Sequence, residues 1–181
     1  MKIINTNIKD VKILEPTIYS DPRGCFFESF NKKKFESILN LKINFVQDNH
    51  SVSKKGVLRG LHYQLPPYAQ AKLVRVVVGE IFDVAVDIRK NSNTFGAWVG
   101  EFLSSDNKKQ LWIPEGFAHG FLTVSDVAEV LYKTTTFYNK DAERIISWKD
   151  DKINIIWPFK NKIYLSDKDN SAINLRISEV F

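Results

Sequence analysis

Two-residue alternation of apolar and polar side chains is the feature that most restricts how this chain can fold. Residues 72–88 read KLVRVVVGEIFDVAVDI, and Phe82, Val84, Val86 and Ile88 would share one face of a strand in its second half. A Gly-Glu step in the middle of the segment predicts that its two halves form a β-hairpin. The period of two indicates a chain built mainly from β-sheet.

Similar short runs recur along the chain with turn residues between them. We expect strands at 11–19, 25–30, 43–50, 57–64, 97–103, 111–113, 119–124 and 128–138. One short helix is expected at 32–39, where apolar residues have helical spacing. The alternating helices that a doubly wound sheet requires are missing, so the pattern favours a β-sandwich or a closed β-barrel.

Length and cysteine content limit the classes of protein further. The 181 residues are enough for one domain, 1–181, with a substantial core. The single cysteine, Cys25, excludes an intrachain disulfide and a cysteine-rich zinc module. The N-terminal residues do not read as a signal peptide, and no apolar run is long enough to span a membrane. We therefore expect a cytoplasmic protein without membrane association.

The net charge of +5 has two interpretations at this stage. It fits an anionic partner, such as nucleic acid, a membrane or a phosphorylated small molecule, and it also fits a lysine-rich solvated surface. The longest basic run is only Lys32-Lys33-Lys34, and acidic residues are interspersed throughout. Charge alone does not identify a partner.

Two segments carry histidines in motif-like surroundings. GVLRGLHYQ at 56–64 contains His62, which is either a general base or a hydrogen-bonded structural residue. WIPEGFAHGF at 112–121 contains Pro-x-Gly-x-x-His and resembles the second metal motif of the cupin superfamily of small β-barrels. Metal-binding cupins carry His-x-His in their first motif, whereas Gln64 stands at the second position here. A site of three histidines would need His50 and His119 as well, so we predict no metal.

Scattered cations and tyrosines are further candidates. Arg23, Arg59, Lys72 and Arg75 could each grip phosphate oxygens or lie on the surface. If the strand at 128–138 is regular, its two tyrosines at 132 and 138 share one face. A tyrosine there could donate a proton or stack on a base, or both tyrosines could simply fill the barrel.

Taken together, these segments resemble the dTDP-4-dehydrorhamnose 3,5-epimerase family. The matching motifs occur in order over about residues 11–176. They are DPRGCFFE (21–28), QDNHSVS (47–53), GVLRGLHYQ (56–64), QAKLVRV (70–76), VDIRKNSNTFG (86–96), QLWIPEGFAHGF (110–121), AEVLYK (128–133) and LSDKD (165–169).

The resemblance implies a mainly β, double-stranded β-helix (a cupin-like jelly roll) with short helices. It implies an isomerase that needs no cofactor and inverts C3 and C5 of dTDP-4-dehydro-6-deoxy-D-glucose through an enolate. The catalytic residues would be His62 as base, Tyr132 as acid, Lys72 at the enolate oxygen and Asp169 as the partner of His62. Residues that bind substrate by the same resemblance would be Arg23, Phe26, Glu28, Gln47, Asp48, Asn49, Arg59, His119, Tyr138, Glu143 and Lys168. Arg23 and Arg59 would hold the diphosphate, and Tyr138 would stack on thymine.

The same resemblance implies a homodimer that binds neither nucleic acid nor membrane. The N-terminal strand would reach the neighbouring subunit, so that Arg23, Phe26 and Glu28 serve the partner's site. Alternatives remain: a relative that inverts only C3 or only C5, or a noncatalytic ligand-binding β-barrel.

One conflict concerns the spacing of Arg59 and His62. Residues three apart lie on opposite faces of a regular strand, yet the resemblance places Arg59 and His62 at one site. Gly60 between them would permit a bulge that restores the same side. We therefore predict irregular backbone at 59–61.

Overall fold

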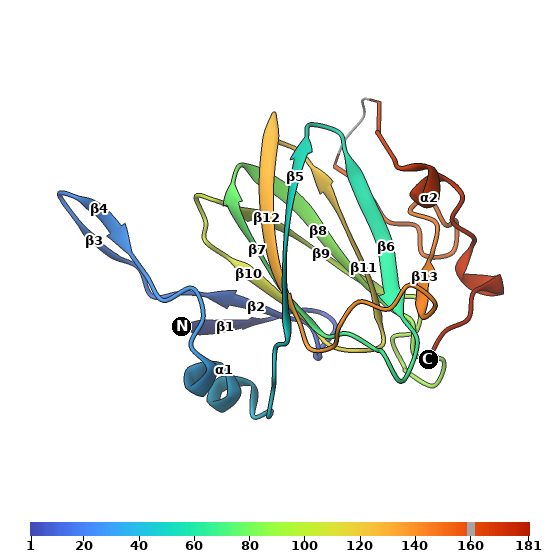
Figure 1. The fold of residues 1–181 in the computed structure, drawn as a ribbon, viewed down its shortest axis with the longest axis horizontal. Coiled ribbons are helices and arrows are strands. Elements are labelled where there is room, and N and C mark those ends of the chain that lie inside the picture. The colour runs from blue at the N-terminus through green and yellow to red at the C-terminus, as the bar shows by residue number, and fades with distance from the viewer. Residues whose placement is uncertain (159–161) are drawn as a thin grey trace.

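The computed structural model describes residues 1–158 and 162–181, and its main body is a jelly roll of two facing antiparallel sheets (Figure 1). The first sheet has the order β1 (Lys2–Asn5), β2 (Lys12–Glu15), β10 (Gln110–Ile113), β7 (Lys72–Val78), β12 (Val127–Thr134) and β5 (Gln47–Lys54). The second has the order β13 (Glu143–Ile145), β6 (Leu58–Gln64), β11 (Phe117–Thr123), β8 (Glu80–Asp87) and β9 (Trp98–Ser104). The mainly β fold expected from the sequence is thus observed.

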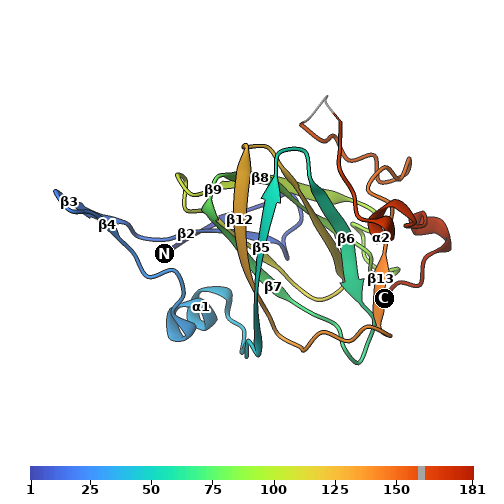
Figure 2. The same ribbon diagram turned by 45° about the horizontal axis from the view of Figure 1, so that its top comes forward.

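The remaining elements lie outside the two sheets. β3 (Tyr19–Asp21) and β4 (Gly24–Phe26) form a hairpin that projects away from the body (Figures 1 and 2). Helix α1 (Lys32–Leu39) begins after Asn31, whose side chain accepts a hydrogen bond from the Lys34 backbone, and has the predicted bounds. The short helix α2 (Asp167–Asn170) and a 3₁₀ turn (Leu175–Ile177) belong to the C-terminal segment.

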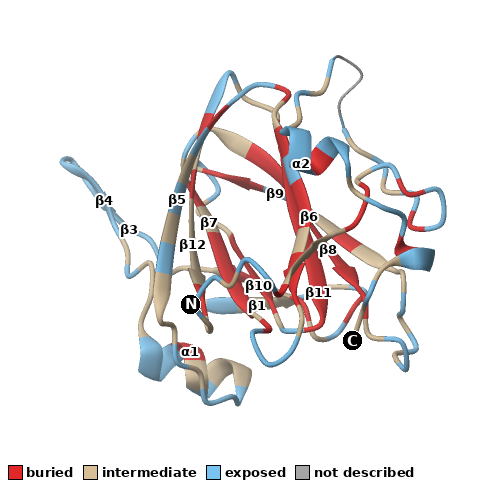
Figure 3. Ribbon diagram, turned by 45° about the vertical axis from the view of Figure 1, so that its right-hand side comes forward, coloured by how far each residue is buried: buried red, intermediate tan, exposed pale blue. Residues whose placement is uncertain are grey.

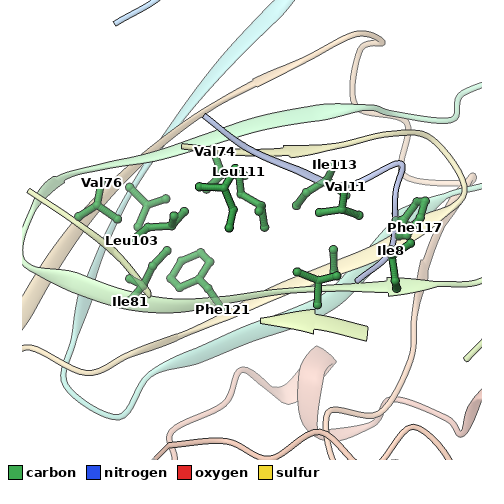
Figure 4. Packing of buried hydrophobic residues seen from close by; sticks show 14 of the residues in the cluster. Ile8, Val11, Val74, Val76, Ile81, Leu103, Leu111, Ile113, Phe117 and Phe121 are labelled. Carbon is green, nitrogen blue, oxygen red and sulfur yellow. The ribbon is translucent and has the colours of Figure 1, made fainter. Parts of the chain in front are cut away.

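The main core fills the space between the sheets (Figure 4). Val74 and Leu111 from the first sheet face Ile81 and Phe121 from the second, and all four are buried. Burial of this apolar surface is the principal stabilising contribution to a fold of this kind.

Each sheet is also covered over part of its outer face, whereas the outward residues of β5 are exposed (Figure 3). Phe35 of α1 packs with Leu73 and Trp112 on the first sheet. The C-terminal segment packs Leu175 over the second sheet, in one cluster with Val84 of β8. β8 is therefore buried on both faces, which explains why every position between its acidic residues is apolar.

The predicted hairpin at 72–88 is wrong. β7 pairs with β10 and β12, whereas β8 pairs with β11 and β9. Gly79, with φ +73°, lies where the chain passes from one sheet to the other. Alternation identifies a strand and its faces, but it does not identify the strand beside it.

The expected strand at 128–138 is also too long. β12 ends at Thr134, so Tyr132 lies in the strand and Tyr138 lies in the loop that follows. The hydroxyl of Thr134 donates to the backbone oxygen of Thr136, which closes a local turn. The two tyrosines therefore do not share a strand face.

No helix in the described ranges, 1–158 and 162–181, is long and apolar enough to cross a membrane.

Candidate active site

A cavity opens between the two sheets at one end of the jelly roll. It has a volume of about 140 Å³. Its walls are formed by Gln47, Asn49, His62, Tyr63, Gln64, Gln70, Lys72, Tyr132, Tyr138 and Glu143. Sites that enclose a whole drug-sized ligand measure roughly 300–1,000 Å³. This cavity is therefore suited to one sugar-sized ring, with the rest of a larger ligand outside.

His62 is held by a carboxylate from the far end of the chain. Nε2 of His62 lies 2.5 Å from Oδ1 of Asp169, which is buried at α2. Burial raises the pKa of Asp169, but hydrogen bonds from His62 and Ser166 outweigh it and hold that pKa below its usual value. Because an ionised carboxylate only accepts hydrogen bonds, Nε2 carries the proton and Nδ1 is left as the basic nitrogen.

Tyr132 approaches the cavity from the opposite sheet. It lies near the end of β12, while His62 lies on β6. Burial raises the pKa of the Tyr132 hydroxyl above its ordinary value of 10. The phenol therefore keeps its proton at neutral pH and can donate it.

Lys72 is a buried cation in the same cavity. Its Nζ donates to the backbone oxygen of His62 at 3.4 Å. Burial lowers the pKa of Lys72 to about 8, although the negative charges of Asp83 and Glu143 oppose the shift. At pH 7 this side chain is still an ammonium group in surroundings of low polarity, where a charge acts strongly on a nearby oxyanion.

A second histidine–carboxylate pair lies behind the first. His119 is directly opposite His62 in the β6–β11 ladder, and its Nε2 lies 2.7 Å from Oδ1 of Asp83. Burial lowers the pKa of His119 despite this carboxylate. Asp83 was not among the residues expected from the sequence, although a carboxylate between apolar residues of a strand was the signal that could have indicated it.

The backbone irregularity predicted at 59–61 is confirmed. Arg59 is opposite Phe121 and His62 is opposite His119, so two residues of β6 face Gly120 alone. Gly60 has φ +135°, and a Cβ there would lie 2.4 Å from the Gly120 Cα. The Nε of Arg59 donates to Ser53 Oγ at 3.0 Å, on the face of β5 that also carries Gln47 and Asn49.

Three side chains form a network at the mouth of the cavity. The hydroxyl of Tyr138 donates to Glu143 Oε2 at 2.8 Å, and Lys168 forms an ion pair with the same oxygen. Burial raises the pKa of Glu143, but the hydrogen bonds from Lys168 and Tyr138 outweigh it and lower that pKa. Half of the Tyr138 surface is exposed and accessible to a ligand.

Four of the expected binding residues lie away from this cavity. Arg23 and Phe26 belong to the β3–β4 hairpin, which projects from the body (Figure 2). Arg23 pairs there with Asp21 at 2.6 Å. Glu28, just beyond the hairpin, pairs with Lys34. Asp48 is on the outer face of β5 and accepts a hydrogen bond from Lys133 at 2.9 Å.

The three histidines do not converge. Nε2 of His50 lies 3.1 Å from Glu129 Oε2 on the outer face of the first sheet, while His62 and His119 face inward. Within residues 1–158 and 162–181, no group of three or more His, Cys, Asp and Glu side chains is placed to hold a metal ion.

An imidazole base, a phenol on the facing sheet and a buried ammonium group define a class of enzyme that moves protons beside a carbonyl group. Comparison with known proteins agrees with this class. The sequence profile described as dTDP-4-dehydrorhamnose 3,5-epimerase matches residues 5–176. A dTDP-4-dehydrorhamnose 3,5-epimerase of Shigella flexneri is 65% identical over 169 residues, which are 93% of each chain.

Solved structures give the same result. The epimerase of Legionella pneumophila in complex with dTDP-4-keto-L-rhamnose has a TM-score of 0.96 and 52% identity, over 98% of this chain and 94% of that one. A 3′-monoepimerase of Streptomyces bikiniensis in complex with dTDP-quinovose has a TM-score of 0.90 and 32% identity, over 95% and 87%. The chain belongs to the dTDP-4-dehydrorhamnose 3,5-epimerase family, a family of isomerases. The alternative of a noncatalytic β-barrel is therefore set aside.

Proposed function

We propose that this chain inverts C3 and C5 of dTDP-4-dehydro-6-deoxy-D-glucose to give dTDP-4-dehydro-L-rhamnose. The hydrogens at C3 and C5 flank the C4 ketone and are acidic for that reason. Removal of one gives an enolate, and return of a proton to the other face inverts the carbon. The ketone itself stabilises the negative charge, so the proposal includes no cofactor and no metal.

One observation carries this proposal: the base and the acid reach the cavity from opposite sheets. Nδ1 of His62 removes the proton from one face of the sugar ring, and Asp169 stabilises the imidazolium that forms. The Tyr132 hydroxyl returns a proton from the other face. The Lys72 ammonium stabilises the enolate oxygen. His119, held by Asp83, completes the buried wall beside Tyr132, their ring centres being 6.5 Å apart.

The nucleotide part is placed at the mouth of the cavity. Tyr138 offers its exposed ring to the thymine, and Arg59 and Lys168 supply positive charge for the diphosphate. Gln47, Asn49 and Glu143 line the entrance. Asp48 acts through its bond to Lys133 on the outer face of β5.

We further propose that the active form is a homodimer, in which the β3–β4 hairpin serves the partner's site. The hairpin carries the aromatic residues Tyr19 and Phe26, which are 63% and 68% exposed in the single chain. Exposed aromatic residues beside an exposed arginine are typical of a surface that another molecule covers. Arg23, Phe26 and Glu28 would then complete the binding of the nucleotide. A cytoplasmic location and the lack of nucleic-acid or membrane partners remain predictions from the sequence.

The test is turnover of dTDP-4-dehydro-6-deoxy-D-glucose in deuterated water, followed by proton NMR. Deuterium at both C3 and C5, together with the L-rhamno product, is expected. Adding a reductase specific for that product then traps it and identifies it.

A second candidate is inversion of one carbon only. Its support is the likeness to the 3′-monoepimerase, which shares the fold at 32% identity. Deuterium at a single carbon, with no L-rhamno product, would establish this candidate in place of the first.

A further inference from the structure

Three glutamine side chains hold the backbone of residues 136–139, the segment that carries Tyr138. Nε2 of Gln70 donates to the oxygen of Thr136 at 2.7 Å, and Oε1 of Gln47 accepts from the nitrogen of Tyr138 at 3.0 Å. Gln64 bonds to the residues on either side of Tyr138. Its Nε2 donates to the oxygen of Phe137 at 3.2 Å, and its Oε1 accepts from the nitrogen of Asn139 at 2.7 Å.

These bonds replace the strand ladder that the segment has left. β12 ends at Thr134, and the chain continues into a loop in which Thr136 and Asn139 are half-buried while Phe137 and Tyr138 are exposed. Backbone groups that have left a ladder take other partners where they are shielded from water. The partners come from three separate places: β5, β6 and the approach to β7. The path of the loop is therefore set by the wall of the jelly roll.

Gln64 is the residue whose chemistry fits this task most closely. It is 3% exposed, and its Nε2 also donates to the oxygen of Tyr68 at 2.7 Å. A primary amide supplies two donor hydrogens and an acceptor from one group, and all three are used here. A histidine or a glutamate at this position could not make the same set of bonds. Gln64, which stands where a metal-binding cupin carries a histidine, therefore holds the loop of residues 136–139.

We propose that Gln64 and Gln70, together with Gln47, are positioning residues that set where the Tyr138 ring lies and so determine affinity for the nucleotide part of the substrate. The inference rests on the proposed function, in which Tyr138 stacks on the base. The Tyr138 ring borders the mouth of the sugar cavity, and its position there sets where the base of the nucleotide can stack. A loop freed from the glutamines would lose that position while the proton-transfer groups stay in place.

The test uses methionine, which keeps the volume of glutamine and removes its hydrogen bonds. For Gln64→Met we expect KM for the dTDP-sugar and Kd for dTDP to rise about tenfold, with kcat within about threefold of the wild type. For Gln70→Met, which loses one bond from a less buried side chain, a rise of about threefold in KM is expected. Thermal unfolding of each variant is measured alongside. If Gln64→Met does not fold, the KM of Gln70→Met decides the test.

The decisive comparison is the double variant. In a Tyr138→Ala background, Gln64→Met should raise KM no further, because the residue acts through the tyrosine. Asn107→Ala is the matched control. The Asn107 amide also bonds to backbone groups, those of Phe102, Ser104 and Lys109, but in the loop between β9 and β10. Its KM should stay at the wild-type value.

Two results would overturn the inference in distinguishable ways. If Tyr138→Ala raises KM but the two methionine variants do not, or if their effects add to that of Tyr138→Ala, the glutamines do not act through the ring. If Tyr138→Ala itself leaves KM and Kd unchanged, the proposed role of Tyr138 fails, and the inference fails with it.

Discussion

At the scale of single residues, His62 has one nitrogen left for chemistry because Nε2 is bonded to Asp169. Substituting His62→Ala should lower kcat at least about a thousandfold, since general-base catalysis is lost, while dTDP still binds. The measurements are turnover by NMR and dTDP affinity by calorimetry. His50→Ala, which removes a histidine from the outer face, is the control and should be fully active. Retained turnover in His62→Ala would show that another group is the base.

Tyr132 is the matching test on the other sheet. Tyr132→Phe keeps the ring and removes the hydroxyl, so a proton can still be taken from the sugar but not returned to the opposite face. We expect deuterium exchange from D₂O into the substrate to continue while formation of the inverted product falls steeply. Normal epimerisation by this variant would assign the acid to a different residue.

The charge of Lys72 should appear in the pH profile. Its pKa is lowered to about 8, so it is an ammonium group below that pH and loses its proton as the pH rises through about 8. Accordingly, kcat/KM, which reports the ionisation of the free enzyme, should fall on the alkaline side near pH 8. Tyr132 titrates later because its pKa is raised above 10. Lys72→Met should be slow at every pH, and a wild-type kcat/KM that stays constant to pH 9.5 would contradict this role.

At the scale of elements, the end of β8 is tied by a buried carboxylate. Asp87 accepts hydrogen bonds from Arg89, Ser92 and Thr94 and thereby fixes the turn into β9. Burial raises the pKa of Asp87, but these bonds outweigh it and lower the pKa to about 2. Breaking such a buried charged network costs about 3–5 kcal/mol.

Asp87→Asn should therefore lower the free energy of unfolding by about 3 kcal/mol at pH 7, as measured by urea denaturation. A depressed pKa stabilises the fold above the unfolded value of about 3.9, and that stabilisation is lost as the pH falls toward 2. The difference between variant and wild type should hence shrink at pH 3. Asp106→Asn, in an exposed turn, is the control. A constant difference from pH 7 to pH 3 would argue against the role of the carboxylate charge.

Local sequence patterns predicted where helices and strands lie better than they predicted which strands lie side by side. Helical spacing of apolar residues places α1 correctly, and the glycine beside Arg59 indicates the bulge of β6. The partners of β7 and β8 could not be read from the same alternation, because they depend on which sheet each strand joins. The contacts of the Tyr138 loop and of the Asp83–His119 pair could not be predicted for the same reason, because the partners are distant in sequence.

At the scale of the whole molecule, the projecting hairpin predicts sites shared between subunits. Arg23→Ala and His62→Ala should each be nearly inactive alone. When the two are coexpressed, half of the dimers are mixed, and one of the two sites in each mixed dimer has an intact cavity and an intact hairpin. About a quarter of the wild-type activity per site should return.

Mixed dimers purified from this population by two different affinity tags should show about half of the wild-type activity per site, because one of their two sites is intact. The two parent proteins mixed without subunit exchange are the control and should remain inactive. A mixed dimer with no recovered activity would mean that each hairpin serves its own chain.

The bond between His62 and Asp169 joins residues 107 positions apart, and the carboxylate comes from the last few turns of the chain. Closing so long a loop is entropically costly and slow compared with local contacts. During synthesis, the jelly-roll strands are complete before the partner of the imidazole has been added. In the proposed mechanism, proton transfer therefore begins only when the segment that carries Asp169 has docked on the second sheet, so that the appearance of activity during refolding would report that docking.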